Sequence, residues 1–195
     1  YSLNVVASDG TNTDTEAIVV NVTDANDNNP VLSVATPYSV AEGATTVATV
    51  TASDADAGTT ITFSLSGTDA ADFAIDSSSG AITFNSAPNF ESPTGGAGNN
   101  SNAYSLNVVA SDGTNSDTEA IVVNVTDTND ESPVLSVSTP YSVVEGATTV
   151  ATVTASDADA GTTITFSLSG TDAADFAIDS SSGAITFNSA PDFET

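Results

Sequence analysis

The sequence contains no lysine, arginine, histidine, cysteine, methionine or tryptophan. Its 26 acidic residues therefore give the 195-residue chain a formal net charge of −26. Nucleic acids and anionic membrane surfaces bind cationic side chains, so we expect neither as a partner. Ser-His-Asp or Cys-His catalysis, and zinc or copper sites, need the histidine or cysteine that is missing here. These absences exclude most of the common enzymatic and nucleic-acid-binding chemistry.

Long hydrophobic runs are also missing. No stretch approaches the ~20 consecutive apolar residues that span a membrane as a helix, and no secretory signal peptide is present. We therefore expect no direct insertion into a membrane. The absence of cysteine fits the cytosol and an extracellular protein without disulfides equally well.

The lack of basic residues also means that no ion pair can form between side chains. Two carboxylates ~4 Å apart repel each other by roughly 4 kcal/mol at an effective dielectric constant of ~20. Clustered acids in this chain therefore indicate a divalent metal. Isolated acids such as Asp14, Glu16 and Asp69 are better explained by solubility.

The chain is built on an internal repeat. Residues 1–92 return as residues 104–195, at an offset of 103 residues, and the two copies differ at only eight positions. The differing pairs are Thr13/Ser116, Ala25/Thr128, Asn28/Glu131, Asn29/Ser132, Ala35/Ser138, Ala41/Val144, Asn89/Asp192 and Ser92/Thr195. A repeat of this length is a whole small domain, so we interpret the chain as part of a tandem array.

Within each repeat, apolar and small polar residues alternate, which is typical of strands with one buried face. Turn residues separate these runs, a Gly/Asn-rich segment follows at 93–102, and residues 69–73 have room for one helical turn. About seven strands per 103 residues predict an all-β fold of tandem seven-stranded Greek-key β-sandwiches. The predicted strands cover residues 31–34, 39–41, 47–52, 61–66, 73–75, 82–84, 104–108 and 121–125.

Polar segments that end in proline, residues 24–30 and 127–133, predict the junctions between domains. The complete repeat is predicted to be residues 28–130. Residues 1–27 would supply the last two strands of a preceding repeat, and residues 131–195 the first five strands of a following one. Pro30 and Pro37 flank the first strand of the complete repeat, which indicates an edge position.

Acidic motifs recur once in each full period. Calcium binds six to eight oxygen atoms from carboxylates, amides and backbone carbonyls, and these motifs can supply them. Neither the EF-hand loop nor the glycine-rich nonapeptide of calcium β-rolls is present. The motifs are Val40-Ala41-Glu42-Gly43, Asp54-Ala55-Asp56-Ala57-Gly58, Asn89-Phe90-Glu91, Ala110-Ser111-Asp112-Gly113 and Asp24-Ala25-Asn26-Asp27-Asn28-Asn29-Pro30.

This set of motifs, in this order, resembles the cadherin repeat, especially the cadherin-like modules of bacterial surface adhesins. The resemblance spans the whole repeat and includes Phe73-Ala74-Ile75-Asp76, followed by Ser79-Gly80-Ala81-Ile82. It implies a cadherin/Ig-like β-sandwich with calcium ions shared between neighbouring repeats at each junction. Two departures occur: Asn89 stands where the family has an aspartate, and Thr59-Thr60 follow the Asp-x-Asp-x-Gly motif where the family has an asparagine.

The resemblance also implies which residues bind calcium. At the 127–133 junction they are Glu42, Asn89, Glu91, Asn129, Asp130, Asp157 and Asp159, with the backbone carbonyls of Thr128 and Glu131. At the 24–30 junction they are Asn26, Asp27, Asp54, Asp56 and Asp112. Asp9 would serve a junction further upstream, and Glu145, Asp192 and Glu194 would serve one further downstream.

Two functions remain open at this point. The first is a calcium-rigidified stalk of an extracellular, cell-surface adhesin, in which adjacent identical repeats are each other's partners. The second is an extracellular filament in which residues 131–195 of one chain and residues 1–27 of the next complete one sandwich by strand exchange. One continuous array is favoured over exchanged strands. An enzyme with paired carboxylates is not expected, because the acids lie at domain ends and no insertion forms a substrate cleft.

Overall fold

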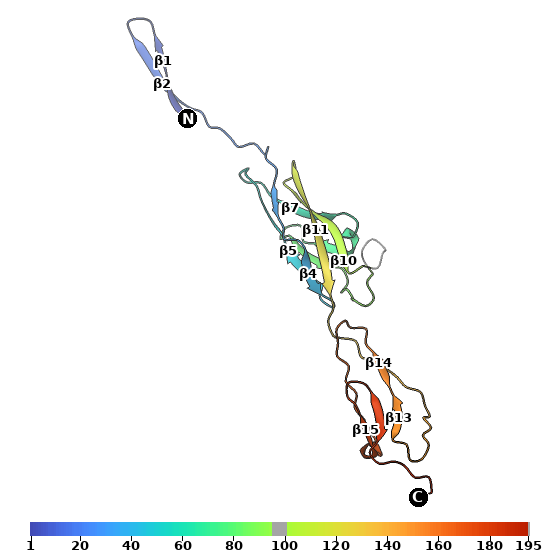
Figure 1. The fold of residues 1–195 in the computed structure, drawn as a ribbon. Coiled ribbons are helices and arrows are strands. Elements are labelled where there is room, and N and C mark those ends of the chain that lie inside the picture. The colour runs from blue at the N-terminus through green and yellow to red at the C-terminus, as the bar shows by residue number, and fades with distance from the viewer. Residues whose placement is uncertain (95–100, 195) are drawn as a thin grey trace. The chain divides into compact units, whose positions relative to one another are not determined.

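The computed structural model describes residues 1–94 and 101–194. These residues form strands and two single 3₁₀ turns, η1 (Ala70–Asp72) and η2 (Ala173–Asp175), which confirms the all-β prediction (Figure 1). Residues 95–100, inside the predicted Gly/Asn-rich segment, lie outside the described part. Among the described residues, no helix has the length and apolarity needed to cross a membrane.

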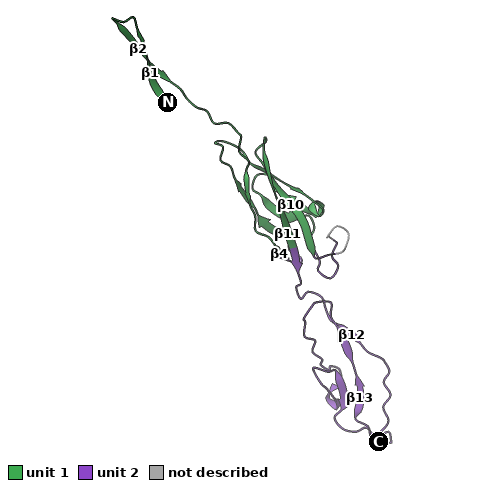
Figure 2. Ribbon diagram, turned by 45° about the horizontal axis from the view of Figure 1, so that its top comes forward, with its two compact units in different colours: residues 1–38, 45–86, 103–123 green, residues 39–44, 87–102, 124–195 purple. Residues whose placement is uncertain are grey.

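The chain divides into two compact units (Figure 2). The first comprises residues 1–38, 45–86 and 103–123, and the second comprises residues 39–44, 87–102 and 124–195. The repeat boundaries expected at residues 27/28 and 130/131 stay a prediction.

The first unit begins with an isolated antiparallel hairpin. Strands β1 (Ser2–Ser8) and β2 (Thr13–Val19) pair from Ser2 opposite Val19 to Ser8 opposite Thr13. Every residue of both strands is exposed. The hairpin therefore has no core of its own, although its sequence alternates like that of a half-buried strand pair.

The complete repeat contains three hydrogen-bonded sheets. The strand between Pro30 and Pro37, β3 (Val31–Ser33), lies at a sheet edge as predicted, and so does β4 (Tyr38–Ala41). The strands predicted at 31–34 and 39–41 correspond to β3 and β4, which belong to different sheets. The predicted strand at 47–52 is interrupted at Val50, whose N–H donates to Gly80 O (3.0 Å). One sheet has the order β4 (Tyr38–Ala41), β11 (Ser116–Thr126), β10 (Ala103–Ser111), β7 (Thr62–Ser66). Facing it are β5 (Thr46–Thr49), β9 (Ala81–Phe84) and β8 (Phe73–Ile75), with β3 (Val31–Ser33) paired to β6 (Thr51–Ser53).

An aromatic cluster joins the two sheets of this sandwich. Phe73 on β8 and Phe84 on β9 lie with ring centroids 4.3 Å apart, and Tyr104 on β10 meets both edge-on at 5.5 and 5.2 Å. Edge-on packing of this kind is favourable beyond the area that it buries. Alternate residues of β10 are buried, from Tyr104 to Ala110, so the predicted period of two marks the core face.

The strand pattern in residues 131–194 differs from the prediction. Segments 165–169 and 141–144 form no strand, although the first is identical in sequence to β7 and the second matches β4 at three of four positions. Because β7 and β4 pair with β10 and β11, and residues 131–194 contain no counterpart of these two strands, their backbone groups have no ladder to join. The strands that form are β12 (Val134–Ser136), β13 (Thr149–Thr152), β14 (Thr154–Ser156), β15 (Phe176–Ile178) and β16 (Ala184–Phe187).

The backbone of Val50 lies so close to Gly80 that we expect this position to tolerate no side chain. A Cβ atom there would lie 2.4 Å from Val50 O, at a backbone φ of +73°. Gly43 has nearly the same φ, +74°, but a Cβ atom there would meet nothing within 4 Å. We expect Gly43→Ala to cost about 1–2 kcal/mol from backbone conformation alone, and Gly80→Ala to cost clearly more. Urea unfolding in chelator measures both, and equal losses would contradict the steric argument.

Candidate metal centre

Glu42 follows β4 directly and holds three segments of the chain together. Its backbone N–H donates to Thr126 O (3.0 Å) at the end of β11. Its carboxylate accepts two backbone N–H bonds of 2.7 Å, from Phe90 to Oε2 and from Thr128 to Oε1. The residue is only 7% exposed. Hydrogen bonds to a carboxylate are among the stronger ones, so Glu42 fixes both the loop after β9 and the start of the linker.

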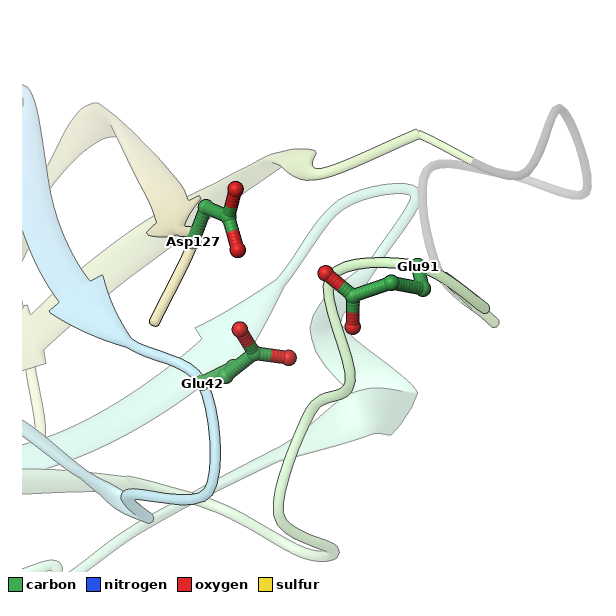
Figure 3. A group of neighbouring side chains, drawn as sticks. All are labelled: Glu42, Glu91 and Asp127. Carbon is green, nitrogen blue, oxygen red and sulfur yellow. The ribbon is translucent and has the colours of Figure 1, made fainter. Parts of the chain in front are cut away.

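Two further carboxylates converge on Glu42. Glu91 lies in the loop after β9 and Asp127 comes immediately after β11, and both turn toward Glu42 (Figure 3). One oxygen of each residue lies within 4.8 Å of the others. Both carboxylate oxygens of Glu91 and Oδ1 of Asp127 are buried without a hydrogen-bond partner among the described residues. Such oxygens are costly to bury unless a donor or a cation compensates for the lost water.

The pKa values within this group diverge. The N–H groups of Phe90 and Thr128 lower the pKa of Glu42, because they stabilise its ionised form. Removal from water raises the pKa of Glu91, and the negative charges of Glu42 and Asp127 raise it further. Positive charge is therefore what this group lacks when all three carboxylates are ionised.

The linker connects the same group to residues 131–194. Asp127 Oδ2 accepts the N–H of Ala160 (2.5 Å), and Asp159 Oδ2 accepts the N–H of Glu131 (3.0 Å). Glu91 also belongs to a second acidic group, with Asp130 and Glu131, whose oxygens lie within 4.8 Å of one another. Residues from the end of one repeat, from the linker and from the next repeat thus lie in one compact unit.

Asp159, on the far side of this linker, has a buried carboxylate that the protein satisfies only in part. It is 5% exposed, and its Oδ1 is buried without a hydrogen-bond partner among the described residues. Burial raises its pKa, and the charges of Asp157 and Asp127 raise it further. Asp157 Oδ1 in turn accepts the N–H of Asp159 (3.0 Å), which orients the Asp-x-Asp pair.

A similar group lies at the 24–30 junction. The carboxylates of Asp54, Asp56 and Asp112 have oxygens within 4.8 Å of one another. One side-chain amide atom of Asn26 lies 2.9 Å from Asp112 Oδ2 and 3.1 Å from Asp56 Oδ2. As an oxygen this atom would be a further cation ligand, and as a nitrogen it would donate to both carboxylates. Backbone hydrogen bonds lower the pKa of Asp112, the larger effect coming from the N–H of Asn115 and the smaller from that of Thr114.

The two junction segments differ at three of the eight positions where the copies diverge, and one of the three, Asn28/Glu131, changes the contacts of the Asp-x-Asp pair. Asn28 donates to both oxygens of Asp56, from its backbone N–H (2.8 Å) and from its side-chain Nδ2 (2.6 Å). Glu131, its counterpart, has only the backbone N–H to offer to Asp159. Asp56 is therefore satisfied by the protein, whereas Asp159 keeps an unpartnered buried oxygen.

The other predicted ligands are distributed unevenly. Glu145, Asp192 and Glu194 have oxygens within 4.8 Å of one another and are all exposed. Four predicted aspartate ligands, Asp9, Asp27, Asp157 and Asp159, belong to none of the acidic groups found among the described residues. The predicted ligands Asn89 and Asn129 carry amides and are not carboxylates. Asp9 accepts the N–H groups of Thr11 and Asn12 in the β1–β2 turn, and Asn89 accepts that of Ser92. All these assignments, and the carbonyl ligands of Thr128 and Glu131, stay predictions.

A family comparison identifies the sandwich between the two junctions. The model of the cadherin domain matches residues 36–126. Residues 36–126 are a cadherin domain. The match covers the sandwich from just before β4 to the end of β11, without β3, and includes Glu42, Glu91 and the Asp-x-Asp pair of residues 54 and 56.

Curated relatives extend the similarity beyond this cadherin domain. The chain is 37% identical over 209 residues to mouse and human cadherin EGF LAG seven-pass G-type receptor 2, and 34% identical over 203 residues to human protocadherin Fat 4. These alignments cover 100% and 95% of the chain but only 7% and 4% of the relatives. The relatives found are animal proteins, so the bacterial part of the sequence resemblance gains no support from them.

Solved cadherin structures share the fold. Mouse cadherin-23 EC22-24 is 28% identical, with a TM-score of 0.67, covering 100% of this chain and 65% of that one. Human CDH23 EC21-23 is 26% identical, with a TM-score of 0.71, covering 99% of this chain and 66% of that one. The β-sandwich predicted from strand periodicity is thus the one that these proteins adopt.

Sequence reasoning did not select Asp127 as a site residue, although its carboxylate belongs to the central group. Asp24 was not selected either; its Oδ2 accepts the N–H of Ala57 (2.6 Å) as Asp127 accepts that of Ala160, but it lies in none of the acidic groups found among the described residues. Both are the first residue of an Asp-x-Asn-Asp sequence that recurs at each junction. The recurrence was visible, but only the fold shows that Asp127 lies beside Glu42 and Glu91.

The Asn28/Glu131 difference predicts that one substitution should give the buried oxygen of Asp159 a hydrogen-bond donor. Glu131→Asn would place a short amide beside Asp159 Oδ1, as Asn28 does for Asp56. We expect a rise in the calcium-free melting temperature of about 4–8 °C, typical for one well-placed interaction in a domain of this size. Circular dichroism in chelator measures it.

Two variants control for charge. Glu131→Gln removes the same charge but carries a longer amide, and should stabilise less than Glu131→Asn. Asn28→Glu should destabilise the 24–30 junction. Equal effects of the two Glu131 variants would show that net charge alone is responsible.

Proposed function

We propose that the chain is a calcium-binding, calcium-rigidified stalk region of an extracellular cell-surface adhesion protein. Its cadherin repeats act as spacers, with no enzymatic role. The single observation that carries this function is the convergence of Glu42, Glu91 and Asp127 around buried oxygens that have no hydrogen-bond donor among the described residues. In a chain without lysine, arginine or histidine, a bound cation is the remaining source of positive charge.

The donor set fits calcium. Carboxylate, amide and carbonyl oxygens in loose geometry are its preferred ligands, and soft ligands are absent from the sequence. At the 127–133 junction we assign Glu42, Glu91 and Asp127 from the complete repeat, Asp130 from the linker, and Asp157 and Asp159 from the next repeat. At the 24–30 junction we assign Asp54, Asp56 and Asp112, with the Asn26 oxygen.

The chain's own contacts explain how a cation would stiffen the junction. Glu42 ties the loop at Phe90 to the linker at Thr128, and Asp127 ties the linker to Ala160. Without positive charge, repulsion among the carboxylates opposes these hydrogen bonds. Calcium, when bound, supplies that charge and shares its ligands between neighbouring repeats, so the same contacts would then be reinforced.

Comparison with named relatives supports the extracellular assignment. A solved structure of protocadherin gamma B2, described as extracellular cadherin domains 3–6, has the same fold, and the curated relatives include a receptor and protocadherins. The chain spans less than a tenth of these curated relatives, so their whole-protein activities are not carried over. A calcium-stiffened stalk would serve a bacterial surface adhesin, as the sequence resemblance suggests, as well as an animal cadherin. Adjacent repeats are its immediate partners.

Small-angle scattering tests the stiffening directly. Millimolar calcium, the range in which extracellular modules bind, should lengthen the maximum dimension of the chelator-treated chain and narrow its distance distribution. Magnesium at equal ionic strength should do less, because it prefers smaller octahedral sites and retains water. Dimensions that respond equally to both ions would indicate charge screening, and unchanged dimensions would contradict a calcium-rigidified stalk.

The carboxylate that lies in both acidic groups offers a second test. Glu91→Gln removes one repelling charge, so it should raise the calcium-free melting temperature by a few degrees. It should also weaken calcium binding by roughly tenfold or more, since even groups that only support a ligand are worth 10–100-fold. The matched control is Glu119→Gln on the exposed face of β11, which should change neither quantity. A calcium midpoint that Glu91→Gln leaves unmoved would remove Glu91 from the site.

A further inference from the structure

The second acidic group at the 127–133 junction contains a carboxylate that has so far no role. Its members are Glu91, which is half-buried, and Asp130 and Glu131, which are exposed, and their carboxylate oxygens lie within 4.8 Å of one another. Both oxygens of Glu91 are buried without a hydrogen-bond partner among the described residues. The carboxylate of Glu91 therefore lies near the charge of Glu42 on one side of its contacts and near two linker carboxylates on the other.

The side chain of Glu131 is available to bind an ion. The contact of this residue with Asp159 uses the backbone N–H of Glu131 (3.0 Å), and no hydrogen bond to its carboxylate is found among the described residues. At the counterpart position, Asn28 directs its side-chain Nδ2 to Asp56 (2.6 Å). The side chain at this linker position is thus bound to the Asp-x-Asp motif at one junction and left free beside Glu91 at the other.

Position 89, two residues before Glu91, is another of the positions at which the copies differ. In the second copy this residue is Asp192, and its carboxylate lies within 4.8 Å of those of Glu145 and Glu194. In the first copy it is Asn89, whose side-chain oxygen accepts a backbone N–H within its own turn. The loop after β9 therefore brings one carboxylate fewer to the group around Glu91 than the corresponding loop of the second copy brings to its own group.

We propose that the side chain of Glu131 binds calcium at the 127–133 junction together with Glu91 and Asp130, and supplies the carboxylate that Asn89 lacks. This rests on the proposed calcium function, and it adds a side-chain ligand where the sequence resemblance implied only the backbone carbonyl of Glu131. Calcium accepts several carboxylates in loose geometry. Binding would also connect the loop after β9, through Glu91, to the two linker residues.

Two differences between the copies are then coupled. The linker gains an acid at position 131, where the first copy has Asn28, and the loop lacks an acid at position 89, where the second copy has Asp192. A junction with asparagine at 131 and aspartate at 89 would contain the same number of carboxylates as the junction present here. Either source of the carboxylate should therefore support calcium binding.

A calcium titration of the intact chain, followed by NMR, tests the ligand at one junction at a time. The amides of Thr128 and Ser132 report the 127–133 junction, and those of Ala25 and Asn29 report the 24–30 junction, because the copies differ at these positions. Glu131→Gln keeps the length of the side chain and removes the carboxylate. It should raise the calcium midpoint of the 127–133 junction by roughly tenfold or more, and leave that of the 24–30 junction unchanged.

Rescue distinguishes a lost ligand from a lost charge. Asn89→Asp, introduced into the Glu131→Gln chain, provides a carboxylate from the loop and should restore most of the calcium affinity. Asn107→Asp, on β10, adds the same charge in the same background and should restore none of it. Glu119→Gln, on the exposed face of β11, removes one charge from the original chain and should leave the midpoint unchanged. Melting curves in chelator verify that each variant is folded.

The outcomes separate this ligand from the calcium function. An unchanged midpoint of the 127–133 junction in Glu131→Gln would overturn the Glu131 ligand and leave the calcium function intact. Rescue by Asn107→Asp as complete as that by Asn89→Asp would overturn it too, because long-range charge would then be responsible. A loss that Asn89→Asp does not restore would overturn the exchange of one carboxylate for the other. No calcium-dependent shift in the unaltered chain would contradict the calcium function itself, and the Glu131 ligand with it.

Discussion

Repulsion among carboxylates that have no basic neighbour is the constraint on which the junctions depend. Glu42, Glu91 and Asp127 converge at the end of the complete repeat, in a chain that contains no lysine, arginine or histidine. The fold compensates for part of this charge with backbone N–H groups, two of them on Glu42. Both oxygens of Glu91 are buried without a hydrogen-bond partner among the described residues, and burial, with the charges of Glu42 and Asp127, raises its pKa. The hydrogen bonds of these carboxylates therefore stabilise the junction, while the repulsion between their charges destabilises it.

The two junctions differ in how far hydrogen bonds compensate for the charge of their aspartates. At the upstream one, Asn28 donates twice to Asp56, and the protein itself satisfies the carboxylate. At the downstream one, Glu131 replaces the asparagine, adds a charge and leaves Asp159 with a buried free oxygen. The Asn28/Glu131 exchange between near-identical copies therefore changes how much of the aspartate charge at each junction the protein itself compensates. Repeats that look interchangeable in sequence are not equivalent in electrostatics.

The strand pattern and the acidic motifs were predictable because both are local. Alternation in residues such as 61–66 and 104–108 marks the strands directly, since side chains on a strand alternate between two faces. The motif order likewise indicated Glu42, Glu91 and the pair at residues 54 and 56 as neighbours of a junction. Asp127 was not predicted as a site residue, because its position beside Glu42 and Glu91 depends on how β4, β11 and the loop after β9 pack together. The motif order likewise could not show that the side-chain oxygen of Asn89 accepts the N–H of Ser92 in its own turn.

The sequence by itself determined the all-β class, the repeat length, the alternation of apolar and polar residues along each strand and the absence of any basic side chain to pair with the acids. Only the tertiary structure decided which of those strands form. Thr62–Ser66 is a strand and the identical segment 165–169 is not, because strand hydrogen bonds come from a partner that is distant in sequence. The same reason applies to Leu3 and Leu106, which lie in the same sequence context: the side chain of Leu3 is 46% exposed and that of Leu106 is 2% exposed. Burial, like strand pairing, belongs to the assembled sandwich and not to the segment that enters it.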